Sequence, residues 1–194
     1  MTEQFIKRLN ALYQMDEMMA DKVRSYTKIA EYKSGDFILR EGQVCNKVCM
    51  VAEGLVRSYY LNDGKDITSR FMEEEAIITS WPSYYTQLPG NEFMEATEDT
   101  ILLCLNYTDI QKLYAEIPEF NIVGRRQVEY AFFLSEQRTQ MLRKNTAEEK
   151  YKFFLKNHPS LLQRVALKHI ATYLGMNEET LSRIRSRFHK NNPW

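Results

Sequence analysis

The sequence of 194 residues predicts an α+β fold in three parts. Short segments of alternating or β-branched residues, separated by turn residues, extend from Tyr26 to about Asn106 and predict an antiparallel, jelly-roll-like β-roll. A helical period then replaces the alternation, first in one long helix and then in shorter ones. We therefore expect a β-roll domain over residues 1–117, a long helix over 118–145, and a winged-helix-like helix-turn-helix domain over 146–194.

The first domain begins with helices and continues with strands. Apolar residues at helical spacing predict a helix within residues 3–24, and Asp16 can cap a second short one. Asp63-Gly64 between two alternating runs predicts a two-residue hairpin, because both turn positions need a positive φ. Seven or eight strands at this spacing indicate a roll or sandwich. Seven strand-like segments can be written out, namely TKIAEY, DFILR, VCMVAEG, LVRSYYL, DITSRFM, FMEAT and TILLCLN.

The middle of the chain predicts a dimerisation helix. Thr108-Asp109 can cap a short helix that Ile117-Pro118 ends. Residues 119–143 then form a helix that is too long for the domain it follows. An apolar stripe on such a helix predicts a homodimer with two-fold symmetry. The stripe consists of Phe120, Val123, Gln127, Tyr130 or Ala131, Leu134 and Met141.

The C-terminal part is basic, although the whole chain has no net charge. From Met141 onward, eleven lysines and arginines stand against four glutamates, so the preceding residues carry an equal acidic excess. Thr146-x-x-Glu149 is a capping box that opens a further helix, which ends before Pro159. A basic module on an acidic body suits a polyanionic partner bound at one end of the protein, although a solvated helix face would have the same composition.

The residues from 167 to 190 have the pattern of a helix-turn-helix. Ile170, Leu174, Leu181 and Ile184 are spaced to bury one face of each of two short helices. Ala171 is small where the helices would cross, Gly175 can end the first helix in a left-handed conformation, and Asn177 can cap the second. Glu179, Thr180, Arg183 and Arg187 would then share one exposed surface of groups that contact bases and phosphates. An ordinary αα-hairpin is the alternative interpretation.

The chain resembles the Crp/Fnr family of bacterial regulators, in a short form that stops soon after its recognition helix. Three stretches carry the resemblance: residues 35–42 (GDFILREG) with Gly54 and Asp63-Gly64, residues 146–151 (TAEEKY), and residues 170–184 (IATYLGMNEETLSRI). The resemblance covers roughly residues 25–190. It implies a cyclic-nucleotide-binding-type β-roll that acts as a sensor, a long helix that forms a two-fold dimer, and a C-terminal DNA-binding domain.

The resemblance also implies roles for single residues. Glu179 and Arg183 would contact bases, and Thr180 and Lys168 would contact phosphates. The family often has an arginine where Glu178 stands, so the operator sequence is open. With few residues after the recognition helix, the wing strand would be missing. The full expected DNA-binding set is Lys168, Glu178, Glu179, Thr180, Ser182, Arg183 and Arg187.

The expected partners follow from the same resemblance. They are double-stranded DNA with an inverted-repeat operator, a second copy of the chain, RNA polymerase, and a small-molecule effector if one exists. No apolar run approaches the roughly 20 residues of a membrane span. Three cysteines cannot all pair, and no secretion signal is visible, so we expect a cytoplasmic protein with reduced thiols. Neither catalysis nor a cofactor is expected, and whether the protein activates or represses is open.

The region that would hold a cyclic nucleotide departs from the family pattern. Such a cassette has a Gly-Glu pair that opens a short helix, followed by Arg-Ser/Thr-Ala, whose arginine neutralises the cyclic phosphate. Residues 76–96 have Ile78-Thr79 at the first position and Asn91-Glu92 or Glu92-Phe93 at the second. A glutamate would repel the phosphate, so we expect no cyclic nucleotide to bind.

The same region is rich in aromatic residues. One interpretation is a pocket for an apolar or amphipathic effector, with Ser80 and Tyr84 as its polar groups. The alternative is that these side chains fill an empty pocket or pack against the long helix. The candidate pocket residues are Phe71, Ser80, Trp81, Tyr84, Tyr85 and Phe93.

Other kinds of site are disfavoured. Cys45, Cys49 and Cys104 are too few for an iron–sulfur cluster and are expected to be buried thiols, with a Cys45–Cys49 redox pair as the alternative. The three histidines lie outside the predicted roll, so a cupin-type metal site is not expected. Two rival functions remain, a jelly-roll enzyme and a roll that acts as a ligand-free protein-interaction module. The enzyme leaves the basic C-terminal part unexplained.

Overall fold

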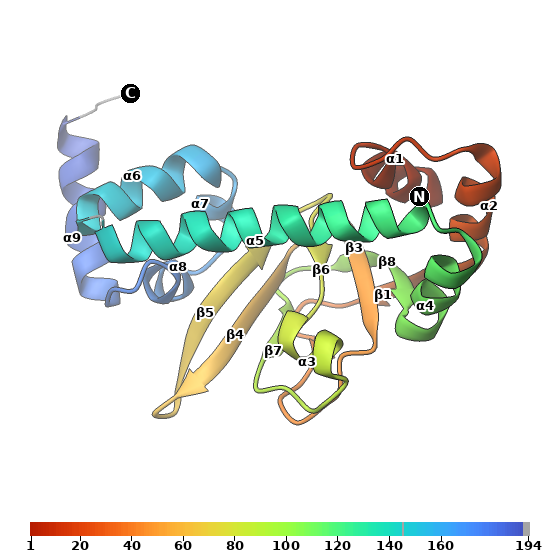
Figure 1. The fold of residues 1–194 in the computed structure, drawn as a ribbon. Helices are drawn as coiled ribbons and strands as arrows, with labels where there is room; N and C mark the ends of the chain where they lie inside the picture. Colours follow the sequence, from red (N-terminus) through yellow and green to blue (C-terminus); the bar gives the residue numbers. More distant parts are fainter. Residues whose placement is uncertain (145, 192–194) are drawn as a thin grey trace.

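Two four-stranded antiparallel sheets form the first domain in the computed structural model, which describes residues 1–144 and 146–191 (Figure 1). The strands are β1 (Lys28–Tyr32), β2 (Phe37–Leu39), β3 (Lys47–Glu53), β4 (Val56–Asn62), β5 (Lys65–Met72), β6 (Ile77–Ile78), β7 (Phe93–Ala96) and β8 (Thr100–Asn106). Their order is β1-β8-β3-β6 in one sheet and β2-β7-β4-β5 in the other. Apolar side chains from both sheets meet between them, which confirms the predicted β-roll.

Helices surround the roll, most of them at the two ends of the molecule (Figure 1). They are α1 (Thr2–Asn10), α2 (Glu17–Tyr26), α3 (Trp81–Thr86), α4 (Tyr107–Glu116), α5 (Phe120–Lys144), α6 (Ala147–Asn157), α7 (Leu161–Arg164), α8 (Leu167–Tyr173) and α9 (Glu178–Asn191). The long α5 passes across the roll from α1, α2 and α4 at one end to α6–α9 at the other (Figure 1). The mixed α+β class and the long helix are therefore as expected.

Local sequence rules account for several boundaries. Asp63 and Gly64 both have positive φ (50° and 72°) between β4 and β5, as a two-residue hairpin requires. Asp16 accepts a hydrogen bond from the Met19 amide at the start of α2. Thr146 and Glu149 form the predicted capping box of α6. These three features depend on neighbouring residues alone, so they could be identified from sequence.

Other elements differ from the expectation. The helix α4 begins one residue before Thr108 and has Asn106 as its N-cap, so Thr108-Asp109 does not cap it. The short elements β6, α3 and α7 were not predicted, because each is too brief to have a periodic pattern. In the described part of the chain no strand follows β8, so no wing accompanies the helix-turn-helix.

A cluster of buried apolar residues joins the roll to the C-terminal helices. Leu55 and Phe71 of the roll pack with Phe154 and Tyr173 of the C-terminal helices. The Phe71 and Tyr173 ring centroids lie 5.2 Å apart. The C-terminal module is therefore docked on the roll through a shared apolar core.

Candidate functional site

The helix-turn-helix has the local geometry that its sequence predicts. Gly175 follows α8 with φ 64°, a conformation that favours glycine. The Asn177 side chain then accepts a hydrogen bond from the Thr180 amide at 2.8 Å and so caps α9. Ile170, Leu174 and Leu181 are fully buried between the helices. These contacts fix α9 relative to α8.

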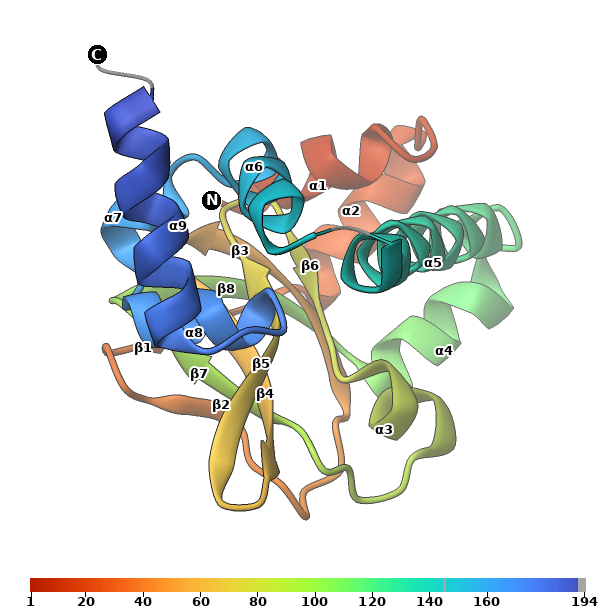
Figure 2. The ribbon, with the colours of Figure 1, turned by 90° about the vertical axis from the view of Figure 1, so that its left-hand side faces the viewer.

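The seven candidate DNA-contacting residues lie on the two helices of this motif. Most of them are exposed, and Thr180 is half-buried, with its hydroxyl 3.5 Å from an Arg183 nitrogen. α9 lies at the edge of the molecule, away from the roll (Figures 1 and 2). The exposed members are Lys168 on α8 and Glu178, Glu179, Ser182, Arg183 and Arg187 on α9.

A hollow of about 610 Å³ lies between α9 and the start of α6. Arg183, Arg187 and Lys152 line it, together with Thr146, the N-cap of α6, and Glu148, which pairs with Lys152 at 2.8 Å. The two arginines beside the N-terminus of α6 make this surface attractive to phosphate oxygens.

A buried arginine fastens α8 to the roll. Arg57 on β4 is 4% exposed and pairs with Asp66 at 2.5 Å and Glu95 at 3.1 Å. It also meets Nδ1 of His169 on α8 at 2.5 Å. The guanidinium lies over the ring of Tyr59, 4.1 Å from its centroid. Arg57 thus joins two carboxylates of the roll to the first helix of the motif.

Two pKa values reflect this contact. Burial lowers the pKa of His169, and the neighbouring Arg57 charge lowers it further. Burial alone would raise the pKa of Asp66, but the hydrogen bond and charge of Arg57 outweigh it and hold that pKa below its ordinary value. The arrangement therefore favours a neutral imidazole that accepts from Arg57, beside an ionised Asp66.

A second arginine links the long helix to the same junction. Arg138 of α5 donates to the carbonyl oxygens of Thr68 on β5 at 3.3 Å and Tyr173 on α8 at 3.0 Å. Its guanidinium lies 3.9 Å from the centroid of the Tyr173 ring. Burial lowers its pKa. Sequence reasoning missed Arg57, Arg138 and His169 as junction residues, because their partners lie far away along the chain.

An ion pair fills the region that corresponds to the cyclic-nucleotide cassette. Arg70 donates to the Glu92 carboxylate at 3.1 Å and to the Thr79 carbonyl oxygen at 2.9 Å. Ser69 donates to the same carboxylate. The arginine at this place is thus already neutralised, and Glu92 would face an incoming phosphate. These residues do not fit a cyclic nucleotide.

The six candidate effector residues do not share one cavity. Phe71 lies in the core between the domains, and Phe93 stacks on Tyr59 with centroids 5.0 Å apart. Tyr84 packs edge-on against Tyr107, and burial raises the pKa of its phenol. Tyr85 is 87% exposed. Trp81 is half-buried on α3, and Ser80 is buried at its start.

A cavity of about 370 Å³ lies instead inside the roll. Its walls come from β2, the β2–β3 connection, β3, β6 and the first part of β7, and it contains both Cys45 and Cys49. The sequence offered no periodic signal for it, because a cavity depends on which side chains from distant strands meet.

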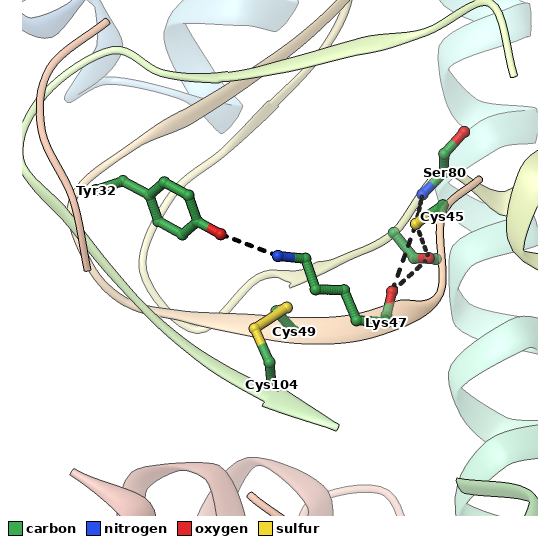
Figure 3. Close-up of a disulfide and its surroundings, with 7 residues drawn as sticks. Tyr32, Cys45, Lys47, Cys49, Ser80 and Cys104 are labelled. Carbon is green, nitrogen blue, oxygen red and sulfur yellow. Dashed lines mark hydrogen bonds between the residues drawn. A yellow bond between two sulfur atoms is a disulfide. The ribbon is translucent and has the colours of Figure 1, made fainter. Parts of the chain in front are cut away.

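The cysteines differ from the expectation of three buried thiols. Cys49 on β3 and Cys104 on β8 lie directly opposite each other and form a disulfide, so neither the all-thiol state nor a Cys45–Cys49 pair is present (Figure 3). Cys45 is the free cysteine and is buried, with its sulfur 3.3 Å from the Thr79 hydroxyl. The pairing could not be read from sequence, because it depends on the register between two strands 55 residues apart.

The middle of α5 has apolar side chains that are exposed to solvent, whereas the apolar side chains near both of its ends are buried against the rest of the chain. Phe120, Val123 and Met141 of the predicted stripe are buried within the chain. Five large apolar side chains between Val123 and Met141 are exposed, and only some of them belong to the predicted stripe. They are Val128 (53%), Tyr130 (45%), Phe132 (66%), Phe133 (52%) and Leu134 (45%).

The described residues show neither a membrane span nor a cluster of metal ligands. No helix among them is both long and apolar enough to cross a membrane. Nor do three or more histidine, cysteine, aspartate or glutamate side chains gather there as a metal site would require.

Comparison with known proteins identifies the domain formed by the roll and shows which regulators the chain is similar to. Residues 29–116 match the cyclic nucleotide-binding domain. The transcriptional activator protein Anr of Pseudomonas protegens is 24% identical over 176 residues, which span 82% of this chain and 69% of Anr.

Solved structures share the fold. FixK2 from Bradyrhizobium japonicum has a TM-score of 0.69 with 22% identity, and 85% of each chain is covered. A CooA mutant from Carboxydothermus hydrogenoformans also reaches 0.69, with 18% identity, over 94% of this chain and 84% of CooA. With the roll, the long helix and the helix-turn-helix in this order, the chain is similar to transcriptional regulators of the Crp/Fnr family.

Proposed function

We propose that the protein is a homodimeric, DNA-binding transcriptional regulator whose β-roll senses an effector other than a cyclic nucleotide. The observation that carries this proposal is α9. This helix is capped by Asn177 and seated on Leu181, and its exposed side is left to polar and cationic residues. A helix of this kind fits the major groove of B-DNA.

DNA recognition would divide between the two helices. Glu179 and Arg183 would meet base edges, because they lie one turn apart on the exposed side of α9. Lys168, Thr180 and Arg187 would meet phosphates, and the cationic hollow beside α6 would extend the backbone contact. Glu178 and Ser182 border the same surface.

The bare middle of α5 supports the dimer. Several large apolar side chains in a row are rarely left in water unless they form an interface. A second copy of α5 against this segment would cover them and give a two-fold axis. We expect RNA polymerase to be a further partner of the DNA-bound dimer.

The Arg70–Glu92 pair argues against a cyclic nucleotide as the effector. A cyclic phosphate would have to displace Glu92 from Arg70 and Ser69 before it could bind. Calorimetry with cyclic AMP is therefore expected to give no saturable isotherm at micromolar concentration. A saturable micromolar isotherm would contradict this part of the proposal.

Selection of duplexes from a random DNA library tests the main proposal. We expect enrichment of an inverted repeat whose half-sites lie about 10 base pairs apart, centre to centre, as two recognition helices about 34 Å apart require. If no sequence is enriched and every duplex binds in a salt-sensitive way, the protein does not recognise a specific DNA sequence and this part of the proposal is wrong. Enrichment of a single half-site would remove the dimer.

A further inference from the structure

A lysine lies on the inner face of the roll without an acidic partner. Lys47 precedes Cys49 and Val51 on β3 by two and four residues, so all three side chains share the face that points between the sheets. The Lys47 ammonium donates to the hydroxyl of Tyr32 at 2.9 Å (Figure 3). Within residues 1–144 and 146–191, no carboxylate lies at ion-pairing distance from it. Two of its three donors are therefore not used by the protein.

Lys47 also lines the cavity inside the roll. The cavity holds about 370 Å³, at the small end of the roughly 300–1,000 Å³ of ligand pockets in proteins. Ile38, Leu39, Ile78 and Met94 supply an apolar wall, and Lys47 is the one charged residue in the lining. Gln43 and Asn46 are exposed and lie at its opening, where their amides can donate to a second oxygen.

We propose that this cavity binds a small carboxylic acid with an apolar body, whose carboxylate pairs with Lys47. The inference rests on the proposed function, because it gives the sensing roll a class of effector. The apolar wall would cover the body of the acid, and the half-buried ammonium would gain the anion that the protein does not provide. A charge-assisted hydrogen bond in such a site is stronger than one in open water.

The cavity overlaps the region of the cyclic-nucleotide cassette only near its two ends, where Ile78, Thr79 and Met94 line it. Between Ser80 and Phe93 no residue lines it, whereas the segment from Gln43 to Lys47 lines it throughout. Arg70, the arginine closest to the cassette, is held by Glu92. A ligand in the cavity would therefore be recognised by Lys47 and not by Arg70.

Calorimetry with benzoate, phenylacetate and hexanoate, each beside its neutral amide, tests the proposal. We expect at least one acid to bind saturably and about tenfold more tightly than its amide. Lys47→Met should remove the preference for the acid, whereas Lys47→Arg should retain it. Lys65→Met is the matched control, because Lys65 is exposed at the far tip of the β4–β5 hairpin and should bind as the parent does.

Alkylation of Cys45 gives a second readout that does not depend on charge. Cys45 lines the same cavity, so a bound acid should slow its reaction with iodoacetamide in the parent and not in Lys47→Met. Circular dichroism of each variant shows whether the roll is intact, and Lys47→Arg keeps the test decisive if Lys47→Met unfolds. The proposal is overturned if none of the three acids binds at millimolar concentration. It is also overturned if Lys47→Met retains the preference for the acid over its amide, or if Lys47→Arg loses that preference. DNA binding is titrated separately, so a failure of DNA recognition would not be mistaken for a failure of the cavity.

Discussion

The two helices of the helix-turn-helix have different surroundings. α8 faces the roll, where His169 meets Arg57 and the Thr172 hydroxyl lies 3.1 Å from that of Thr68. α9 buries Leu181 against its neighbours and leaves Arg183 and Arg187 in solvent. The first helix is therefore held by the roll, and the second leaves its outer face in solvent.

The same contrast exists along α5. Phe120 and Met141, near its two ends, are buried by the domains that they touch, while Phe132 between them is 66% exposed. The buried segments stabilise the folded chain, and the exposed segments are the ones to which we assign DNA binding and dimerisation in the proposed function. Substitutions in the two kinds of segment should accordingly change different measurements.

The largest effect is expected at Arg57. Arg57→Met leaves Asp66 and Glu95 without their shared cation, and both carboxylates are partly exposed. The free energy of unfolding should fall by about 3 kcal/mol, the low end of the range for a broken buried ion pair. Urea denaturation measures it. Arg125→Met is the control. The ion pair of Arg125 with Glu129 is exposed, so this variant should lower the free energy of unfolding by no more than about 0.5 kcal/mol. Equal effects of the two variants would contradict the contrast.

A somewhat smaller effect is expected at Phe132. A glutamate there would be buried and unpaired in the proposed dimer, while the monomer would keep its stability. Phe132→Glu should weaken dimerisation by at least about 2 kcal/mol, which is about thirtyfold in the dissociation constant. Sedimentation equilibrium measures this constant. Tyr85→Glu, at an aromatic residue of the roll that is 87% exposed, should leave it unchanged. Dimerisation that survives Phe132→Glu would exclude this segment of α5.

Arg183 and Lys168 separate the two kinds of DNA contact. Arg183→Ala should cost about 1–3 kcal/mol of discrimination against the wrong base, because an arginine can bind a guanine edge through two hydrogen bonds. Its weak, salt-sensitive affinity for random DNA should remain. Lys168→Ala should weaken binding to operator and random DNA about equally. Anisotropy titrations at two salt concentrations decide between these outcomes. A parallel loss in Arg183→Ala would make Arg183 a backbone contact.

The smallest effect is expected from the titration of His169. Its pKa is lowered in the folded protein, so the unfolded chain binds the proton more readily. The stability from the neutral imidazole is then complete above the ordinary pKa of 6.5 and is lost as the pH falls through the lowered value. The facing charges are Arg57, Asp66, Glu95 and Lys168. Of these, Asp66 titrates below its ordinary pKa of 3.8, outside this window.

His169→Gln isolates that titration, because glutamine can accept from Arg57 without binding a proton. Unfolding free energies measured between about pH 8 and pH 5 should decrease more for the parent than for the variant. Identical pH profiles would mean that His169 is not linked to docking.

Sequence predicted the elements that depend on neighbouring residues. The Asp63-Gly64 hairpin, the Thr146 capping box and the Gly175–Asn177 turn each follow from the conformational preference of one or two side chains. The exposed surface of α9 follows from the spacing of Leu181 and its apolar neighbours. The candidate DNA-contacting residues could therefore be listed without a structure.

Contacts between distant segments could not be predicted in this way. Phe71 was expected in an effector pocket, but its face of β5 is covered by Tyr173, which follows it by about a hundred residues. The contact between Arg57 and His169 spans 112 positions. The cavity at Lys47 depends on four strands and the β2–β3 connection meeting inside the roll. Alternation indicates which side chains point inward, but not which of them leave space.

The Cys49–Cys104 disulfide closes residues 49–104 of the roll into a ring of chain. Everything from β4 to β7 lies between these two cysteines, including Arg57, Asp66 and Thr68, which contact α8. Closing a loop across 55 residues disfavours the unfolded chain by about 4 kcal/mol in the chain-entropy description. A protease cut anywhere within the ring would leave two fragments joined through sulfur. The β4–β5 hairpin, which contacts α8, would then stay attached to the rest of the roll until a reductant separated it.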